Sequence, residues 1–238
     1  MQTRTETITA PDGQTFDAHL VLPESGGGPG ILVLQEIFGV NEYIREVCER
    51  LAGLGYVAMA PDVFWRIERN VQLGTGDDAL KAAYGYIGQY DWQSGIPDLA
   101  AALEHLRALP ETGGRAAALG FCFGGTTSFA LACVANPDAV VSYYGSGVPD
   151  WCDRADDVIA PVLLHFGAND PYIPSEQIDK VREWAESQPS VTFRSYESGH
   201  AFDNHTSPMF SDPPAAAAAW EATQQFLAEH YPVEGGAG

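Results

Sequence analysis

A glycine-rich stretch at residues 120–125, with the sequence GFCFGG, constrains the fold more than any other part of the chain. It has the form of a nucleophile elbow, in which a reactive residue sits on a strained turn between a strand and a helix. Cys122 stands where serine is more usual, at a helix N-terminus whose free N–H groups and dipole favour a thiolate. The alternative is a buried structural cysteine in a glycine-rich turn. The surrounding sequence must decide between the two.

Strands alternate with helices along the chain, which predicts a mostly parallel sheet covered by helices on both faces. A turn at residues 11–13 joins the first two strands into an antiparallel hairpin at one edge. Asn41 is the expected N-cap of a helix that ends near Gly53 or Gly55. We expect one domain over residues 1–238, with a short flexible tail from about residue 233. The predicted strands cover residues 5–9, 16–22, 31–34, 56–60, 115–119, 139–143, 162–166 and 191–196, and the other helices 77–89, 96–109, about 123–135, 175–187 and 214–231.

The charge balance excludes several classes of partner. With 12 Lys and Arg against 32 Asp and Glu, the net charge is −20, which repels nucleic acid and anionic membranes.

Residues 1–10 are polar and predict neither a signal peptide nor a membrane span, so we expect a cytoplasmic protein. The four cysteines show no metal-ligand spacing, and a reducing compartment keeps them as thiols. We expect a monomer, with a homodimer as the alternative.

A catalytic thiol needs a base to take its proton and a carboxylate to orient that base. Asp170 follows the predicted strand at residues 162–166, and His200 follows the strand at 191–196. Both therefore lie at the carboxyl edge of the sheet, where such folds build their sites. His205, five residues beyond His200, is the nearest rival for the base. The order nucleophile, acid, histidine predicts a Cys-His-Asp triad.

The loop at residues 35–39, with the sequence QEIFG, follows the third predicted strand. In α/β-hydrolases this loop supplies half of the oxyanion hole. The backbone N–H groups of Ile37 and of Phe123, the residue after the nucleophile, are therefore the expected oxyanion donors. Glu36 is either a solvated loop acid or a contact of the thiol, and its place beside the elbow favours the contact.

The chain carries QEIFG at residues 35–39, GFCFGG at 120–125, Asp170 before a proline, and SGHAF at 198–202, all in the same order and spacing as one known family. In these motifs it resembles the dienelactone hydrolases, or carboxymethylenebutenolidases. The resemblance covers nearly the whole chain. It implies a single-domain α/β-hydrolase fold without a large cap domain, and no cofactor or metal. It also implies that Cys122 is the nucleophile, His200 the base and then the acid, Asp170 the orienting carboxylate, and Glu36 a partner that tunes the thiol.

The chain departs from this family at the positions that bind the substrate carboxylate. The family uses arginines there, whereas Leu80 and Asn204 stand at the matching positions and neither pairs with a carboxylate. Arg66 and Arg69, in a polar segment at 65–76 that we expect to form a lid, are the candidate replacement cations. The other expected substrate contacts are Tyr84 and Tyr144, which match family site positions, and Phe38 and Phe202, which lie within the motifs.

The sequence therefore predicts a hydrolase that opens small lactones or esters through a thioester intermediate, as part of aromatic compound degradation in the family. A broad carboxylesterase, or a hydrolase of a different lactone, would use the same residues. The alternative outside the hydrolases is a redox-sensing or binding module built on Cys122. Such a module does not need both His200 and Asp170, and it does not need the oxyanion loop. The presence of all three in the sequence therefore favours the hydrolase.

Overall fold

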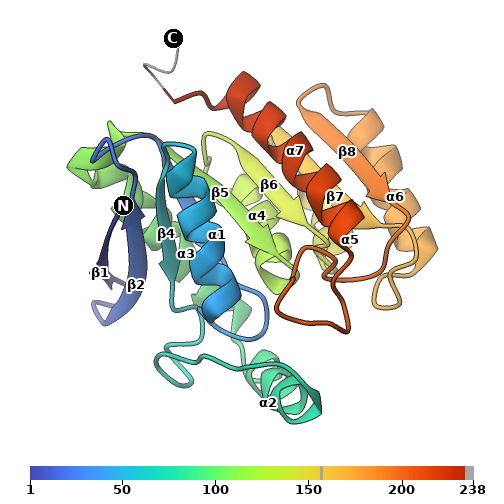
Figure 1. Ribbon diagram of the computed structural model, residues 1–238, viewed down its shortest axis with the longest axis horizontal. Helices are drawn as coiled ribbons and strands as arrows, with labels where there is room; N and C mark the ends of the chain where they lie inside the picture. The colour runs from blue at the N-terminus through green and yellow to red at the C-terminus, as the bar shows by residue number, and fades with distance from the viewer. Residues whose placement is uncertain (156–157, 234–238) are drawn as a thin grey trace.

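An eight-stranded sheet runs through the computed structural model, which describes residues 1–155 and 158–233 (Figure 1). The strands lie in the order β1-β2-β4-β3-β5-β6-β7-β8. The first two form the expected antiparallel hairpin at one edge, β2 pairs antiparallel with β4, and the rest are parallel. The strands are β1 (Gln2–Thr9), β2 (Thr15–Leu22), β3 (Gly30–Leu34), β4 (Val57–Pro61), β5 (Ala116–Phe121), β6 (Val140–Tyr143), β7 (Val162–Gly167) and β8 (Val191–Tyr196).

Helices cover both faces of the sheet. In Figure 1, α1 and α7 lie in front of the sheet, whereas α2 stands apart at the lower edge of the molecule. The helices are α1 (Glu42–Gly53), α2 (Asp77–Ile87), α3 (Trp92–Ala108), α4 (Phe123–Val134), α5 (Val148–Trp151), α6 (Ser175–Glu186) and α7 (Pro213–His230), with short 3-10 turns at Pro110–Thr112 and Cys152–Arg154. Asn41 caps α1 as expected, because its side chain accepts a hydrogen bond from the Ile44 N–H.

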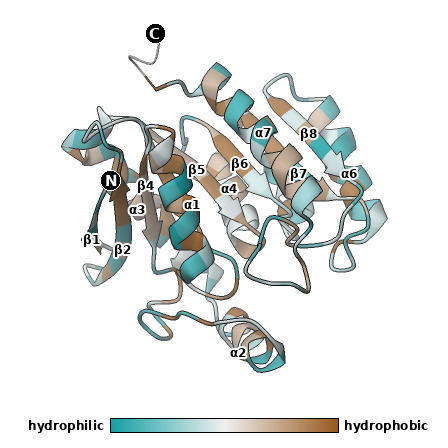
Figure 2. Cartoon of the chain, viewed as in Figure 1, coloured by the Kyte–Doolittle hydropathy of each residue, from teal (hydrophilic) through white to brown (hydrophobic). Residues whose placement is uncertain are grey.

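The alternating strand residues divide the core between the two faces. Ile31 and Val33 of β3 pack in the cluster that contains α1 and α7, whereas Leu32 and Leu34 pack in the cluster that contains α3. The strands β3, β4 and β5 therefore carry apolar residues or glycine on both faces, and β6 and β7 each add one buried polar residue, Ser142 and His165 (Figure 2). Buried on both faces, these strands hold their carboxyl ends in fixed positions along one edge.

The predicted start of α3 is wrong. We expected a helix from residue 96 with Pro97 in its first turn, but α3 begins at Trp92 and Pro97 lies inside it. The Asp91 side chain accepts hydrogen bonds from the Gln93 N–H and the Ser94 hydroxyl. This cap starts the helix one turn early, and the missing N–H of Pro97 removes only one bond near that end.

Within residues 1–155 and 158–233, no helix combines the length and the apolar character that crossing a membrane requires. The expected flexible tail falls mostly on residues 234–238, which lie outside the described residues.

Candidate active site

Cys122 lies on the sharp turn between β5 and α4, with φ 54° and ψ −112°. The glycines around it permit a close approach of backbones that no side chain would allow. A Cβ atom on Gly120 would lie 2.0 Å from the Gly124 carbonyl oxygen, and one on Gly124 would lie 2.1 Å from the Leu34 carbonyl oxygen. The sequence therefore builds the predicted elbow, with the thiol at the N-terminus of α4.

Backbone strain gathers at this same edge of the sheet. Cys122 follows β5, Tyr144 follows β6, and Ala201 lies in the loop after β8, and all three non-glycine residues have positive φ angles between 39° and 54°. Such conformations cost about 1–3 kcal/mol each and persist only where the surroundings enforce them. Their clustering around one thiol marks this edge as the candidate active site.

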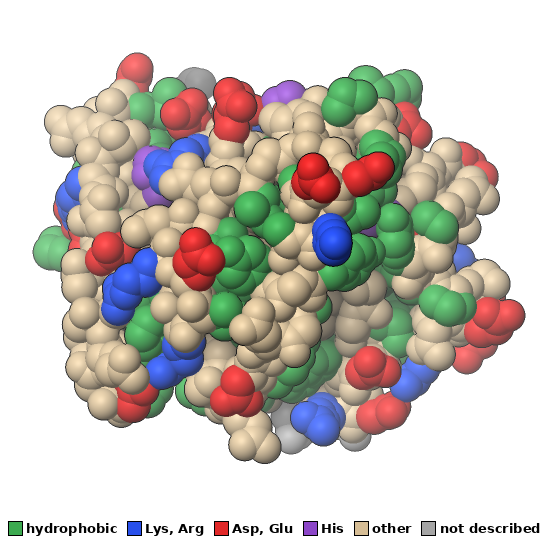
Figure 3. Space-filling view, turned by 90° about the horizontal axis from the view of Figure 1, so that it is seen from below, with side chains coloured by type: hydrophobic (Ala, Val, Ile, Leu, Met, Phe, Trp, Pro, Cys, Tyr) green, Lys and Arg blue, Asp and Glu red, His purple; other side chains and the backbone are tan. Residues whose placement is uncertain are grey.

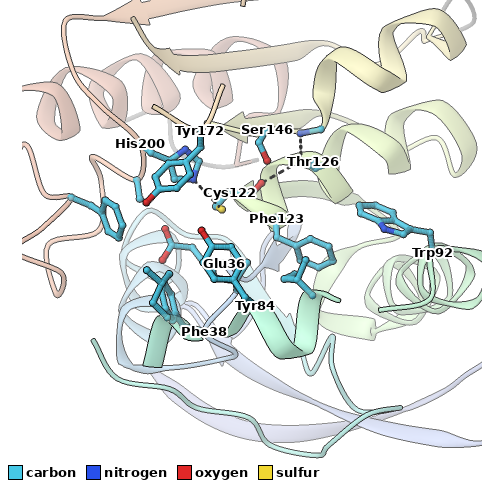
Figure 4. Close-up of a pocket in the computed structure, with 16 residues that line it drawn as sticks. Glu36, Phe38, Tyr84, Trp92, Cys122, Phe123, Thr126, Ser146, Tyr172 and His200 are labelled. Atoms are coloured by element: carbon cyan, nitrogen blue, oxygen red, sulfur yellow. Dashed lines mark hydrogen bonds between the residues drawn. The ribbon is translucent and has the colours of Figure 1, made fainter. Parts of the chain in front are cut away.

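Cys122, His200 and Asp170 form a continuous chain of contacts, of which Figure 4 shows the contact between Cys122 and His200. The His200 Nε2 atom lies 3.1 Å from the Cys122 Sγ atom, and its Nδ1 atom lies 2.6 Å from Asp170 Oδ2. The other oxygen, Asp170 Oδ1, accepts a hydrogen bond of 2.8 Å from the Tyr172 N–H. Because a carboxylate only accepts, Nδ1 carries the proton and Nε2 is free to take one from the thiol.

A tight crossing of two loops brings Asp170 and His200 together. A Cβ atom on Gly167, at the end of β7, would lie 2.3 Å from the Gly199 carbonyl oxygen. The loop after β8 therefore packs directly on the end of β7. Burial lowers the pKa of His200, but the charge of Cys122 and the hydrogen bond that His200 donates to Asp170 outweigh it and raise the pKa well above its usual value. These neighbours stabilise an imidazolium beside the sulfur.

Glu36 lies at the start of the loop after β3 and is 1% exposed. Its Oε2 atom accepts a hydrogen bond of 2.6 Å from the Asn204 Nδ2 atom, and its Oε1 atom lies 3.5 Å from the Tyr144 hydroxyl. The Thr206 hydroxyl and N–H both donate to Asn204 Oδ1, which leaves only the amide nitrogen of Asn204 to face Glu36. Glu36 thus faces the cavity beside Cys122, but its hydrogen bonds go to Asn204 and Tyr144.

The charge of Glu36 makes the stability of the fold depend on pH. Burial raises the pKa of the Glu36 carboxyl from 4.5 to about 7, and the Asn204 hydrogen bond opposes that shift only in part. The folded state thus binds this proton more tightly than the unfolded chain does. This group adds stability below about pH 4.5, and the stability is lost as the pH rises to about 7.

Relative to Glu36→Gln, we expect the wild-type protein to lose about 3 kcal/mol of unfolding free energy between pH 4.5 and pH 7.5. Glutamine keeps an acceptor for Asn204 but carries no charge. Urea unfolding of both proteins across this range measures the difference, in which the other titrating groups cancel. A difference that stays constant with pH would show that Glu36 does not titrate in this window.

A cavity of about 230 Å³ opens beside the thiol. Three of its lining residues, Leu80, Tyr84 and Ile87, come from α2, which covers one side of the opening. Ile37 and Phe123 also line it, so both expected oxyanion donors lie at the cavity wall. The remaining lining residues are Glu36, Phe38, Trp92, Cys122, Thr126, Ser146, Gly147, Tyr172, His200, Ala201 and Phe210.

Some expected substrate contacts lie elsewhere. Arg66 is outside the cavity lining, because its guanidinium binds both oxygens of Asp98, at 2.6 and 2.9 Å, and Asp12 at 2.7 Å. Arg69 donates to the Thr15 carbonyl oxygen. The expected replacement cation is thus not brought to the thiol. Tyr144 and Phe202 are fully buried behind the cavity and pack on each other.

The segment at residues 65–76 does not form the expected lid over this cavity. None of its residues lines the cavity, whereas α2 directly after it supplies three. Sequence reasoning also missed Trp92, Tyr172 and Phe210 as wall residues. Tyr172 had a usable signal, since it stands two residues after Asp170 at a strand end. His205, the rival base, pairs instead with Glu46 at the surface.

No group of three or more His, Cys, Asp or Glu side chains suited to holding a metal ion occurs within residues 1–155 and 158–233. The reactive groups at the site are the Cys122 thiol, the His200 imidazole and two buried carboxyls, those of Asp170 and Glu36. This set is suited to nucleophilic attack on a carbonyl carbon.

Comparison with known proteins gives one consistent result. Residues 16–231 match the dienelactone hydrolase family. A carboxymethylenebutenolidase from a Pseudomonas species is 34% identical over 234 residues, which cover 98% of each chain. Carboxymethylenebutenolidase 1 from Cupriavidus pinatubonensis is 32% identical over 222 residues, which cover 93% of this chain and 94% of the relative.

Solved structures agree with the sequence matches. A Klebsiella pneumoniae protein solved as a candidate dienelactone hydrolase superposes with a TM-score of 0.82 at 25% identity, covering 96% of this chain and 100% of that one. A dienelactone hydrolase-like promiscuous phosphotriesterase from metagenomic libraries superposes with a TM-score of 0.77 at 28% identity, covering 97% and 99%.

Proposed function

Because the chain belongs to the dienelactone hydrolase family, we propose that it opens small lactones or esters by nucleophilic catalysis at Cys122. It has the α/β-hydrolase fold and is an enzyme of the carboxylic ester hydrolase class. The observation that carries the proposal is the contact chain from Cys122 through His200 to Asp170 at the wall of the cavity.

In the first half of the reaction, His200 Nε2 takes the thiol proton and the Cys122 sulfur attacks the carbonyl carbon. The new S–C bond gives a tetrahedral intermediate whose oxyanion is held by the N–H groups of Ile37 and Phe123. Phe123 is the first residue of α4, so its N–H has no partner within the helix. The C–O bond then breaks, and the leaving alkoxide takes the proton from His200.

In the second half, a water molecule attacks the thioester and gives its proton to His200. The C–S bond breaks, the sulfur recovers the proton from His200, and the carboxylic acid product leaves. With a lactone, the alcohol and the acid remain in one molecule. Asp170 holds His200 in one orientation and tautomer through both halves.

Glu36 is the proposed partner of the thiol. Its carboxyl lines the same cavity as Cys122, and Asn204 fixes the position of the carboxyl. A pKa raised by burial to about 7 lets this group exist in either charge state near neutral pH. Its charge state adjusts the field at the sulfur without a direct hydrogen bond to it.

Trapping the acyl-enzyme tests this function. With 4-nitrophenyl acetate, we expect a burst of about one equivalent of nitrophenol and, after acid quench, one acetyl group on the peptide that contains Cys122. Cys133→Ala serves as the control and should give the same burst. An acetyl group on any other residue, or turnover with no acyl-enzyme and no need for Cys122, would refute the mechanism.

A further inference from the structure

Apart from His200, which contacts Cys122, the cavity has no basic side chain among its sixteen lining residues, because no lysine or arginine is one of them (Figure 4). Its wall consists largely of aromatic and aliphatic groups. Three aromatic residues that line the cavity are 40–51% exposed, and they form an aromatic rim around its mouth: Tyr84, Trp92 and Tyr172. Figure 3 shows hydrophobic side chains in the middle of this face, with acidic and basic ones scattered around and between them.

The arginines of the neighbouring elements are engaged in other contacts. Arg66 is held by Asp98 and Asp12, and Arg50 pairs with Asp203 at 3.1 Å. Lys81 follows Leu80 on α2, but it is exposed and does not line the cavity. In the described part of the chain, a substrate carboxylate in this cavity would therefore find no lysine or arginine as a partner, and both ring nitrogens of His200 already contact Asp170 and Cys122.

The fixed charges at the thiol are on balance negative. The single imidazole of His200 lies between the Cys122 sulfur and the Asp170 carboxyl, and the Glu36 carboxyl faces the same space, so two acidic groups stand against one basic group. The partners of Glu36, Asn204 and Tyr144, are uncharged. An anion entering here loses its hydration and meets like charge, which is costly without a paired cation.

We propose that this pocket selects uncharged, apolar lactones and esters and disfavours substrates that carry a carboxylate group. The proposal rests on the proposed hydrolytic function and names its substrate class. Leu80 is one of three neutral α2 residues in the cavity wall, and it is partly exposed. A longer side chain at that position has room to place its head group at the mouth.

A matched pair of substrates tests the selectivity. One is a butenolide that bears a carboxymethylene group, and the other is its methyl ester, which removes the charge of that group and adds one methyl group and a second ester bond. Rates of lactone opening are measured in about 0.5 M NaCl, which screens the long-range repulsion from the net charge of −20. We expect kcat/KM for the methyl ester to exceed that of the carboxylate by at least about tenfold.

Three variants assign the selectivity to charge in the cavity. Leu80→Arg should reduce the preference about tenfold by pairing with the carboxylate, whereas Leu80→Met, a neutral control of similar volume, should keep it. Glu36→Gln should narrow the preference severalfold, because it removes a like charge. Lys81→Gln should leave the preference unchanged. The neutral substrate and circular dichroism check that each variant is folded.

The outcomes separate this inference from the function on which it rests. Equal or faster opening of the carboxylate by the wild-type protein overturns the inference, as does an equal change of preference in Leu80→Arg and Leu80→Met. If neither substrate is opened faster than by Cys122→Ala, the proposed function itself is wrong.

Discussion

Replacing Cys122 by alanine is expected to lower kcat for ester and lactone hydrolysis by about 10⁴-fold or more. Alanine removes the proposed attacking atom, since the sulfur is the group that His200 Nε2 contacts at 3.1 Å. The cavity and the oxyanion donors stay in place, so a small residual rate over the uncatalysed reaction should remain. Steady-state kinetics with an aryl ester and a butenolide measure the loss.

The other cysteines provide matched controls for this result. Burial raises the pKa of Cys48 and Cys152 to about 12 and that of Cys133 to about 11, so all three stay protonated at neutral pH. Cys133→Ala should therefore keep its activity, and iodoacetamide should inactivate the wild-type protein by alkylating one thiol. Full activity in Cys122→Ala, or inactivation that follows another cysteine, would contradict the assignment.

The order of helices and strands could be predicted because the apolar residues of the sequence follow a clear periodicity. Apolar runs such as the one in β3 are too short for helices and are bounded by turn residues, so they indicate strands buried on both faces. The strand β5 was harder to predict, since three of its six residues are alanine. Contacts with β3 and β6 on either side override this weak propensity.

The meeting of the three proposed triad side chains was predictable for a related reason. Each member follows its own parallel strand, and parallel strands deliver their carboxyl ends to one edge. The position of each residue directly after a parallel strand therefore predicts that Cys122, Asp170 and His200 lie together. The cavity wall is different, because it depends on where α2 and the aromatic side chains settle after folding. Nothing in the local sequence around Arg66 shows that Asp98, thirty-two residues away, holds its guanidinium.

The same limit applies to Asn204. From its sequence position it is only a neutral residue where a cation was expected. In the structure its amide is fixed by Thr206 and holds the Glu36 carboxyl, which is a positioning role. Long-range pairs of this kind are set by the packed fold, and no periodicity or motif in the sequence encodes them.

Asp170→Asn is expected to lower kcat by about 10³- to 10⁴-fold at neutral pH, through the tautomer of His200. The Tyr172 N–H donates to one oxygen of Asp170, so the carbonyl oxygen of an asparagine would take that position. Its NH₂ group would then face His200 Nδ1, which must become an acceptor. The ring proton moves to Nε2, and Nε2 no longer accepts the proton of the Cys122 thiol.

This tautomer argument also predicts a change in thiol reactivity. Burial works to lower the pKa of His200, and Asp170 helps to raise it, so its loss should weaken the thiolate–imidazolium pair. Alkylation of Cys122 in Asp170→Asn should then be slower at neutral pH and should recover at higher pH, where hydroxide deprotonates the thiol. Asn169→Ala, at the exposed neighbouring position, is the matched control and should retain wild-type rates. If Asp170→Asn keeps kcat within about tenfold of the wild-type value, the carboxylate does not orient His200 and the triad reduces to a Cys-His pair.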